Sequence, residues 1–515
     1  MYIVPSSARS LFRTVIEGGV CLCMIMLFSQ TWFIDGLVVP CRVAGGSMAV
    51  ALLGMHHDVI CADCGFAFAC DTAVRPASPR AICPNCGYAN NNMESLPDLD
   101  GDRVLIDRWA FHFRQPRRWE IVAFRYPQEA RKIVIKRVVG LPGESIQILN
   151  GDVYVNGQIQ RKTLDRQRSM AVMVYDANYS PARTPTGPIL HPRWQGENEK
   201  SLWISDHGRF THPDVRRLSK SSYTSESLVK RPHPGPLPTA GAVPGKGTIS
   251  GNLPTAGAAP GDETIDWLVY HHWRRIPLGQ GEVQECPITD IMAYNQSLPR
   301  REEDVHAISD LMLSFRLMKT FGQGKFFIRA DYGKDVFLLE IDPEAGIYRI
   351  NRNNREISPE DNRIALENKA LDVVVSLIDR QFLLALNDRT VYCLPMDDPV
   401  PRTEPTSQPF AIGTTGLGVV VEDLRIYRDI YYTHPIGRGR RWLQENSTQL
   451  GDNEYFVLGD NSSIAEDSRT WPVSSPVIDN LLIGKPLMIL FPAKSVTIGN
   501  WQFQVPDPRR IGYIR

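Results

Sequence analysis

Short runs of β-branched and aromatic residues, separated by turn dipeptides, recur along most of this 515-residue chain. Four such runs lie between residues 101 and 158, where the pairs Asn150-Gly151 and Asn156-Gly157 are strong signals for hairpin turns. Further runs follow one another at regular spacing over 264–432, a rhythm typical of a β-sandwich. The sequence therefore predicts a mainly β protein made of antiparallel sheets, long enough for two to four domains.

The longest apolar segment lies close to the N-terminus. Residues 15–34 are largely apolar and about as long as the hydrocarbon core of a lipid bilayer requires. Arg9 and Arg13 precede them, and positively charged flanks tend to stay in the cytoplasm. We therefore predict a single transmembrane helix over 15–34, with residues 1–14 in the cytoplasm and the rest of the chain outside it. A buried core helix and a cleaved signal peptide are the alternative interpretations.

The charges of the chain are balanced, with 57 Lys and Arg residues against 57 Asp and Glu residues. This balance gives no indication of a nucleic-acid partner. The chain also lacks the G-x-S-x-G, P-loop and H-E-x-x-H motifs, which removes the most common hydrolase and nucleotide-binding interpretations.

Two residues of the chain have the chemistry of a nucleophile and its general base. Ser47 follows two glycines soon after the apolar segment, and Lys136 lies inside an apolar, strand-like run. Burial disfavours the charged form of a lysine and so lowers its pKa. A neutral amine can take a proton from a serine hydroxyl, which allows a Ser-Lys dyad to work without histidine. Taken singly, a serine among small residues and a lysine on an edge strand are both ordinary structural features.

Four segments, in this order, resemble the sequence boxes of bacterial type I signal peptidases: Ser47-Met48, 101–108, 136–143 and 459–469. The apolar segment lies where that family has its membrane anchor. The resemblance covers roughly 200 residues and implies an antiparallel β catalytic domain of the signal peptidase type. In this chain the domain would be divided into a nucleophile segment (35–54), a lysine segment (98–165) and a C-terminal segment (433–515).

The resemblance also implies a function and a set of site residues. The family removes signal peptides from translocated precursor proteins, cleaving after small residues in an Ala-x-Ala setting, and needs no cofactor for catalysis. By matching position, Ser47 would be the nucleophile and Lys136 the general base. Salt bridges would brace the site through Arg137, Asp460, Asp467 and Arg469.

The chain departs from the family pattern at three places. Gly45 stands where a hydroxyl often helps the oxyanion hole, and Ala49 and Val50 follow the Ser-Met pair, where a proline soon afterwards is usual. Ala465 replaces a serine that orients the lysine, a role that Ser463 or water could take. Loss of one oxyanion donor costs about two to three orders of magnitude in rate, so a weak enzyme is conceivable.

Two other functions remain open at this stage. One is a self-cleaving Ser-Lys protease like those of regulatory repressors, which the apolar anchor and the absence of a helix-turn-helix disfavour. The other is an inactive descendant that acts as a membrane-anchored binding protein through its β-sandwich. The presence of both Ser47 and Lys136 argues against an inactive descendant.

A cysteine cluster lies between the first two boxes. Within residues 55–92, Cys61 and Cys64 form one C-x-x-C pair, and Cys83 and Cys86 form another. Two such pairs at this spacing are typical of a structural zinc ribbon, in which four thiolates complete a tetrahedral site. A pair of disulfides is the alternative, since the topology predicted above places the module outside the cytoplasm.

A long insertion separates the lysine box from the last box. Residues 166–263 are polar and contain a Pro- and Gly-rich linker in which LPTAGAVPG at 237–245 recurs as LPTAGAAPG at 253–261. The strands predicted over 264–432 resemble a concanavalin- or laminin-G-like sandwich. We predict an inserted module that binds a glycan or a protein ligand, or one that is purely structural.

Overall fold

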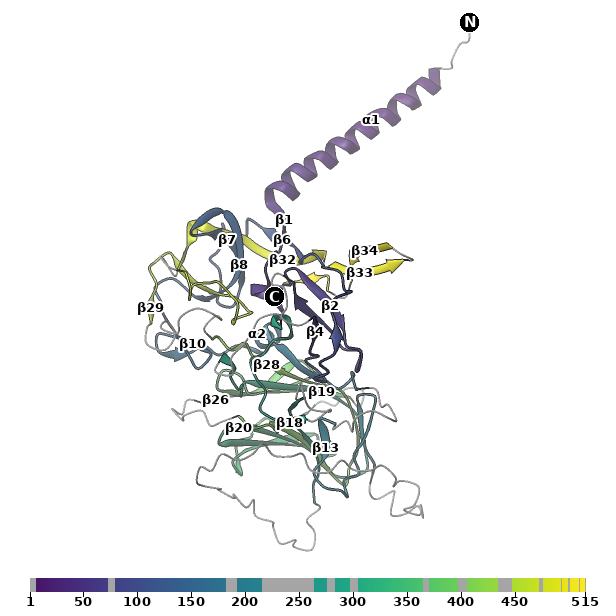
Figure 1. The fold of residues 1–515 in the computed structure, drawn as a ribbon, viewed down its shortest axis with the longest axis vertical. Coiled ribbons are helices and arrows are strands. Elements are labelled where there is room, and N and C mark those ends of the chain that lie inside the picture. The colour runs from purple at the N-terminus through teal and green to yellow at the C-terminus, as the bar shows by residue number, and fades with distance from the viewer. Residues whose placement is uncertain are drawn as a thin grey trace.

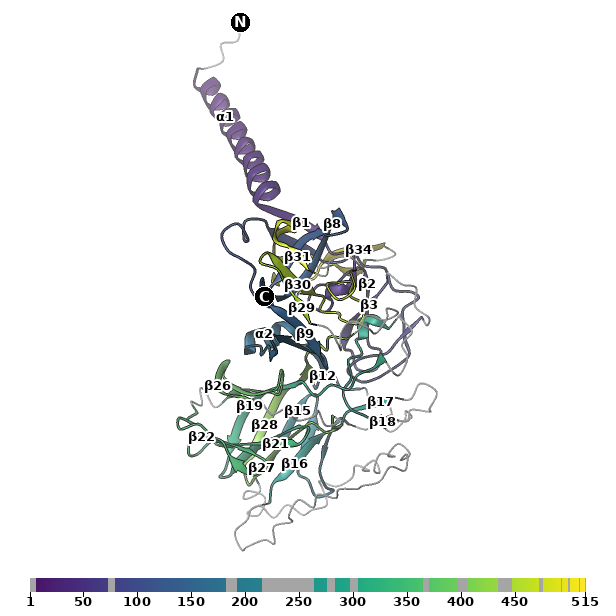
Figure 2. The ribbon, with the colours of Figure 1, turned by 90° about the vertical axis from the view of Figure 1, so that its left-hand side faces the viewer.

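A computed structural model of the chain describes residues 6–72, 79–181, 192–214, 264–275, 283–296, 304–364, 370–396, 405–433, 447–471, 476–491, 493–498, 501–508 and 510–514. Helix α1 (Ser6–Ser29) projects from one end of the molecule, as Figures 1 and 2 show. A β body follows it, and a pair of larger sheets lies at the opposite end (Figure 1). Described strands make up most of the regular structure, in agreement with the mainly β prediction.

Helix α1 continues into the π-helical segment η1 (Gln30–Leu37). Large apolar side chains of α1 are exposed, with Leu22, Met24 and Phe28 each more than half accessible to solvent. Among the residues that the structure describes, no helix is both long and apolar enough to cross a membrane. The transmembrane helix predicted over 15–34 is therefore not supported, although that segment is helical over most of its length.

The β body is built on one eight-stranded antiparallel sheet that combines segments far apart in sequence. Strand β8 (Glu129–Gly140) pairs with β7 on one side and with β30 on the other. The strand order is β1-β6-β32-β7-β8-β30-β31, and β35 also pairs with β32. The remaining bounds are β1 Val38–Arg42, β6 Arg103–Asp107, β7 Ile121–Tyr126, β30 Glu454–Leu458, β31 Val477–Ile478, β32 Leu482–Phe491 and β35 Gly512–Tyr513.

A second, four-stranded sheet packs close to the end of β8. Both Asn-Gly pairs form its hairpin turns as predicted: Asn150 and Asn156 each have φ of 50°, and the following glycines are also at positive φ. The strand order is β11-β10-β9-β29. The bounds are β9 Ser145–Leu149, β10 Asp152–Val155, β11 Gln158–Ile159 and β29 Thr448–Gln449.

Two large antiparallel sheets form a sandwich around one hydrophobic core, to which Leu313, Phe326 and Phe382 contribute. The first has the order β14-β15-β28-β19-β24-β25-β26, with β12 beside β28, and the second has the order β13-β16-β27-β20-β21-β22-β23. The first sheet's bounds are β12 Val172–Asp176, β14 Ile204–Asp206, β15 Arg209–His212, β19 Leu311–Phe321, β24 Leu371–Ser376, β25 Gln381–Leu386, β26 Arg389–Pro395 and β28 Gly418–Arg428. The second sheet's bounds are β13 Trp194–Gly196, β16 Asp266–Tyr270, β20 Lys325–Tyr332, β21 Asp335–Asp342, β22 Ile347–Arg352, β23 Arg355–Glu356 and β27 Phe410–Thr415.

The sandwich draws on more of the chain than residues 264–432. Strands from 172–212, in the region predicted to be polar, also join its two sheets. Ile204–Asp206 shows why this was missed, because all three residues of that edge strand are exposed and carry little hydrophobic pattern. The Pro- and Gly-rich linker with its repeat lies outside the described residues.

Short hairpins and helices complete the fold. The cysteine module consists of the hairpins β2–β3 and β4–β5. The remaining bounds are β2 His56–Ile60, β3 Ala67–Asp71, β4 Arg80–Ala81, β5 Asn91–Asn92, β17 Trp273–Arg275, β18 Val283–Glu285, β33 Ala493–Ile498, β34 Trp501–Pro506, α2 Leu164–Met170, η2 Gly46–Met48, η3 Ala293–Asn295 and η6 Asp479–Leu481.

Candidate active site

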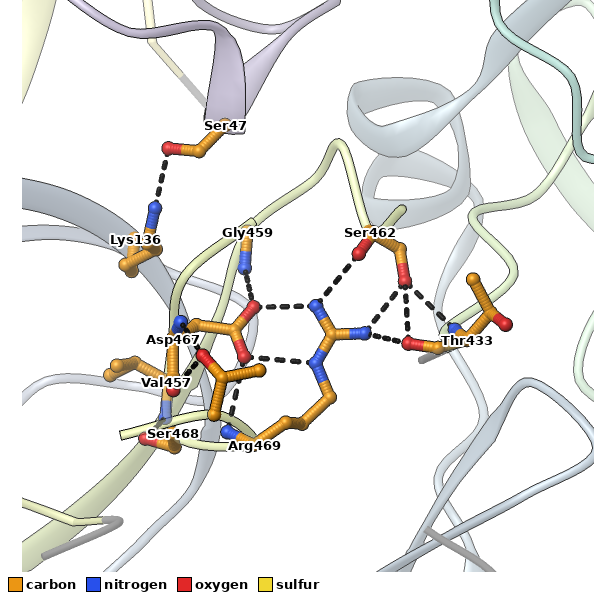
Figure 3. Close-up of polar contacts among 10 residues, drawn as sticks. Ser47, Lys136, Thr433, Val457, Gly459, Ser462, Asp467, Ser468 and Arg469 are labelled. Atoms are coloured by element: carbon orange, nitrogen blue, oxygen red, sulfur yellow. Dashed lines mark hydrogen bonds and ion pairs between the residues drawn. The ribbon is translucent and has the colours of Figure 1, made fainter. Parts of the chain in front are cut away.

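Ser47 and Lys136 meet although 89 residues separate them in the sequence. Ser47 lies in the single 3₁₀ turn η2, and its side chain is partly exposed. Lys136 Nζ donates a hydrogen bond to Ser47 Oγ at 2.5 Å, as Figure 3 shows. A hydroxyl that is accessible on one side and in contact with an amine on the other can act as a nucleophile.

The change in burial along β8 explains the position of Lys136. The strand is exposed at its start and fully buried from Lys136 onward, so the amine lies at the point where the strand enters the core. Lys136 is 2% exposed. Burial lowers its pKa to about 8, against the opposing attraction of the Asp467 carboxylate. A substantial fraction of this amine is therefore neutral slightly above neutral pH.

The next residue on β8 points the other way and forms a buried ion pair. Arg137 Nε and Nη2 bind the two carboxylate oxygens of Asp460 at 2.8 and 2.6 Å. Arg137 Nη1 donates to the carbonyl oxygen of Trp119 at 2.7 Å. Both side chains of the pair are almost fully buried, and the two parallel bonds fix β8 against the loop that follows β30.

A second buried pair lies inside the 459–469 loop (Figure 3). Arg469 Nε and Nη2 bind the carboxylate of Asp467 at 2.9 and 2.6 Å, and the same carboxylate accepts the backbone N–H of Gly459 at 3.0 Å. Arg469 also donates to Ser462 Oγ at 2.8 Å and to the Thr433 carbonyl. The four residues predicted to brace the site thus form two separate pairs, each with both charges buried.

The same loop holds the backbone on both sides of Ser47. The Asn461 backbone N–H donates to the Ser47 carbonyl at 3.0 Å, and its side-chain Nδ2 donates to the Gly46 carbonyl at 3.0 Å. Asn461 is fully buried. The sequence-based selection of site residues omitted Asn461. Its place directly after Asp460, in a Gly-Asp-Asn turn, was the only available signal.

The structure shows what surrounds Gly45 and Ala465, two of the positions that depart from the family pattern. Gly45 contributes no side chain to the turn. The candidate oxyanion donor is therefore the Ser47 backbone N–H, without help from a hydroxyl at position 45. Ala465 is fully buried, and a Cβ atom added at Gly459 would lie 2.5 Å from both the Ala465 Cβ and the Ser47 carbonyl oxygen. Ser463 Oγ accepts a hydrogen bond from Asn295 Nδ2 at 2.9 Å.

A pocket of about 150 Å³ borders the nucleophile segment. Its lining includes Ala49, Val50 and Ala51 from the nucleophile segment, and Met170 of α2 and Val172 of β12. The hollow next to the turn that carries Ser47 is thus lined by small and apolar side chains together with the polar residues Ser169 and Asp460.

The four clustered cysteines converge at one point. Their sulfur atoms all lie within 4.8 Å of one another, with Cys61 and Cys86 at 3.5 Å and Cys64 and Cys83 at 3.7 Å. All four are buried free thiols. Tetrahedral zinc with Zn–S bonds of about 2.3 Å requires sulfur atoms about 3.8 Å apart, whereas a disulfide requires about 2.05 Å. The donor set and its spacing fit a zinc ion.

The two C-x-x-C turns have the same backbone geometry. In each, the N–H of the first cysteine donates to the carbonyl five residues later, and the N–H of the glycine donates back to the first cysteine, all at 2.9 Å. Gly65 and Gly87 adopt positive φ of 76° and 70°, which favours glycine at both positions. The two turns thus present their four sulfur atoms to one another with the same local backbone geometry.

Comparison with known proteins relates part of this chain to one enzyme family. Residues 84–231 match the family described as "Signal peptidase, peptidase S26". The matched segment contains Lys136, while Ser47 and the 459–469 loop lie outside it. "Signal peptidase I" of Leptolyngbya laminosa is 43% identical over 72 residues, which are 12% of this chain and 35% of that protein. "Probable signal peptidase I-2" of Synechocystis sp. is 38% identical over 127 residues, 24% of this chain and 53% of that protein.

The chain thus spans between about a third and a half of the length of these two relatives. Solved structures similar to it include the Caenorhabditis elegans galectin LEC-6, with a TM-score of 0.18 and 13% identity over 23% of this chain and 81% of that chain. Another is carbohydrate-binding module CBM66 from Bacillus subtilis, with a TM-score of 0.19 and 15% identity over 31% of this chain and 94% of that chain. At these TM-scores the likeness supports no inference, and the ligand predicted for the sandwich stays a prediction.

Proposed function

We propose that this chain is a serine endopeptidase that removes signal peptides from secreted precursor proteins. Ser47 is the nucleophile and Lys136 the general base. The hydrogen bond of 2.5 Å between Lys136 Nζ and Ser47 Oγ, formed by a buried amine of lowered pKa, carries the proposal. The similarity of residues 84–231 to signal peptidases supports the same substrate class.

The chemistry requires the neutral form of Lys136. Its lone pair accepts the Ser47 proton while Oγ attacks the scissile carbonyl, and the Ser47 backbone N–H stabilises the negative charge that develops on the carbonyl oxygen. The resulting ammonium returns the proton to the leaving amine of the mature protein. Water, activated by the same amine, then hydrolyses the acyl-enzyme and frees the signal peptide. Burial supplies the neutral amine without histidine or metal.

The bracing pairs have a structural part in this proposal. Arg137 with Asp460 fixes the 459–469 loop against β8, and Asp467 with Arg469 fixes the loop internally. The loop in turn holds the carbonyl groups of Gly46 and Ser47. A displacement of the nucleophile by about 1 Å can cost about a hundredfold in rate, so this rigidity matters for catalysis.

The decisive experiment is the cleavage of a precursor carrying an Ala-x-Ala site in detergent. Wild type should cleave it, and Ser47→Ala and Lys136→Met should each lose at least about 10³-fold in kcat. Lys132→Met is the matched control, because Lys132 is an exposed lysine on the same strand. Equal activity in all four proteins would exclude the dyad, and an inactive wild type would favour a binding protein.

Attachment to a membrane through α1 is also part of the proposal, with the catalytic body on the extracytoplasmic side. The exposed apolar side chains along α1, among them Val20, Ile25 and Leu27, would gain from burial in lipid. In flotation with phospholipid vesicles the full chain should rise with the lipid. A chain with Val20, Ile25 and Leu27 changed to Gln should stay behind, and equal behaviour of both would exclude α1 as the attachment.

The cysteine module is proposed to hold structural zinc through Cys61, Cys64, Cys83 and Cys86. A metal saturated by four thiolates has no open position, so it would stabilise the module and take no part in cleavage. Metal analysis should give about one equivalent of zinc, lost in Cys61→Ser/Cys83→Ser and kept in the control Cys393→Ser. Two disulfides with no metal would contradict the assignment.

A further inference from the structure

One loop of the inserted region reaches the back of the nucleophile turn. We call residues 286–296, which follow β18 and contain η3, the η3 loop. Its residues Tyr294 and Asn295 are buried, with 3% and 2% exposure. Asn295 lies 166 residues before its partner Asn461 in the sequence and far outside the segment matched to signal peptidases. Part of the packing around the nucleophile turn of the β body therefore comes from the insertion.

Asn295 and Asn461 form a reciprocal pair of side-chain amides. Asn295 Nδ2 donates to Asn461 Oδ1 at 2.6 Å, and Asn461 Nδ2 donates to Asn295 Oδ1 at 2.7 Å. Asn295 Nδ2 also donates to Ser463 Oγ at 2.9 Å. A planar amide has its acceptor oxygen on one side and its two N–H donors on the other. This pairing therefore fixes which way the Asn461 amide faces.

The orientation of Asn461 matters because its other amide proton serves the nucleophile turn. Asn461 Nδ2 donates to the Gly46 carbonyl at 3.0 Å, while the Asn461 backbone N–H donates to the Ser47 carbonyl at 3.0 Å. Without Asn295 the amide would be free to rotate and leave the Gly46 carbonyl. Asn295 thus acts on Ser47 at one remove, through Asn461.

Tyr294 limits the same turn from a second direction. A Cβ atom added at Gly46 would lie 2.1 Å from Tyr294 Cε1, so the tyrosine ring lies directly against the glycine. Tyr294 Oη donates a hydrogen bond to the Met55 carbonyl at 3.0 Å, which ties the ring to the residue directly after the nucleophile segment. The turn is therefore held between the η3 loop and the 459–469 loop.

The η3 loop also contacts the cysteine module, through Gln296. Gln296 Nε2 donates to the Ile82 carbonyl at 2.7 Å, and Gln296 Oε1 accepts the Ile82 backbone N–H at 2.5 Å. Gln296 and Asn295 are adjacent and each makes side-chain hydrogen bonds. Gln296 is consequently a matched control for Asn295.

We propose that Asn295, supplied by the insertion, is a positioning residue for Ser47, and that the inserted region is required for full catalytic rate. The inference rests on the proposed function. Asn295 touches neither substrate nor the reacting atoms. It orients Asn461, and Asn461 sets the distance and direction of Ser47 Oγ relative to Lys136 Nζ.

The test compares steady-state cleavage of the Ala-x-Ala precursor by full-length variants. Asn295→Ala should lower kcat about 10- to 100-fold with KM changed less than about twofold, because ground-state binding does not use the amide. Gln296→Ala should leave kcat within about twofold. Asn295→Asp keeps the side-chain volume but loses both donated hydrogen bonds, so it should also lower kcat. A loss of kcat in this variant cannot be attributed to the cavity that Asn295→Ala leaves.

A double-mutant cycle separates positioning from general packing. If Asn295 acts through Asn461, the double variant Asn295→Ala/Asn461→Ala should be no slower than Asn461→Ala alone. The inference would be overturned if the effects of the two substitutions on kcat multiply, or if kcat is unchanged in folded Asn295→Ala and Asn295→Asp. An active wild type would still leave the proposed function standing. No cleavage by wild type, or full cleavage by Ser47→Ala, would overturn the proposed function and this inference with it.

Discussion

Two buried lysines in this chain have opposite electrostatic environments. Lys136 in the β body and Lys162 at the junction with the sandwich are 2% and 4% exposed. Lys136 Nζ binds a neutral hydroxyl, whereas Lys162 Nζ lies 2.5 Å from Asp379 and 2.9 Å from Asp429. Burial lowers the pKa of Lys136 to about 8. Burial would also lower the pKa of Lys162, but its two carboxylate partners outweigh that effect and raise the pKa.

The difference shows that burial alone does not activate a lysine. A directly bound carboxylate keeps the amine charged and converts it into a structural cation, while a hydroxyl partner leaves it able to lose its proton. The acids near Lys136 make this clear. Asp460 and Asp467 are engaged by Arg137 and Arg469, so neither carboxylate binds the amine directly.

Removal of Lys162 should have the largest effect on stability. Lys162→Met leaves Asp379 and Asp429 buried without their cation, and we expect a loss of about 3–5 kcal/mol in unfolding free energy. Burial already raises the pKa of both carboxyl groups against the opposing attraction of Lys162, and loss of the cation should raise these pKa values further, so the loss of stability should grow as pH rises from 4 to 8. Thermal unfolding of folded full-length protein across this range measures it. Lys325→Met, which breaks a partly exposed pair with Glu340, should cost no more than about 1 kcal/mol.

Lys136→Met should act in the opposite direction on stability. The folded-state pKa of about 8 lies below the ordinary value of 10.5, so folding of the wild type carries a cost that is complete below pH 8 and vanishes above about 10.5. That cost is on the order of 3 kcal/mol, from which the lost hydrogen bond to Ser47 must be subtracted. The variant should therefore melt at a higher temperature than wild type at pH 7, and at a similar one near pH 10. A lower melting temperature at pH 7 would contradict the environment described for Lys136.

The pH dependence of cleavage should follow the neutral fraction of Lys136. With a pKa of about 8, kcat/KM should rise about tenfold between pH 7 and pH 9 and then level off. Initial rates at low precursor concentration measure this limb. A profile centred below pH 7 would instead indicate a different base.

The smallest effect should come from Glu466, an exposed residue whose negative charge raises the pKa of Lys136. Glu466→Gln removes that charge, so the acidic limb of the profile should move slightly to lower pH. High salt should reduce the difference between the two proteins, because salt screens an exposed charge. A shift to higher pH would show that Glu466 acts in some other way.

The sequence motifs selected residues that the fold brings together, since the spacing of the boxes already defined one loop and one strand. Arg137 and Asp460, 323 residues apart, form a bidentate pair, and the four cysteines converge. Asn295 and Tyr294 carried no such signal. A single asparagine beside a tyrosine in an irregular loop is common, and only tertiary packing gives it a partner. The strands at 172–212 were missed for a similar reason, because edge strands lack a strong hydrophobic alternation.

The hydrogen bond between Asn461 and Gly46 closes a loop of 415 residues, which affects when the active centre can exist. A ribosome adds about 5–20 residues per second, so roughly 20–80 s pass between the synthesis of the nucleophile turn and that of the loop that holds it. Throughout that interval Ser47 is present without Asn461 and without the 459–469 loop. Because of this geometry, the hydrolytic centre is complete only when nearly the whole polypeptide has been made. Proteolysis therefore begins well after Ser47 has been synthesised.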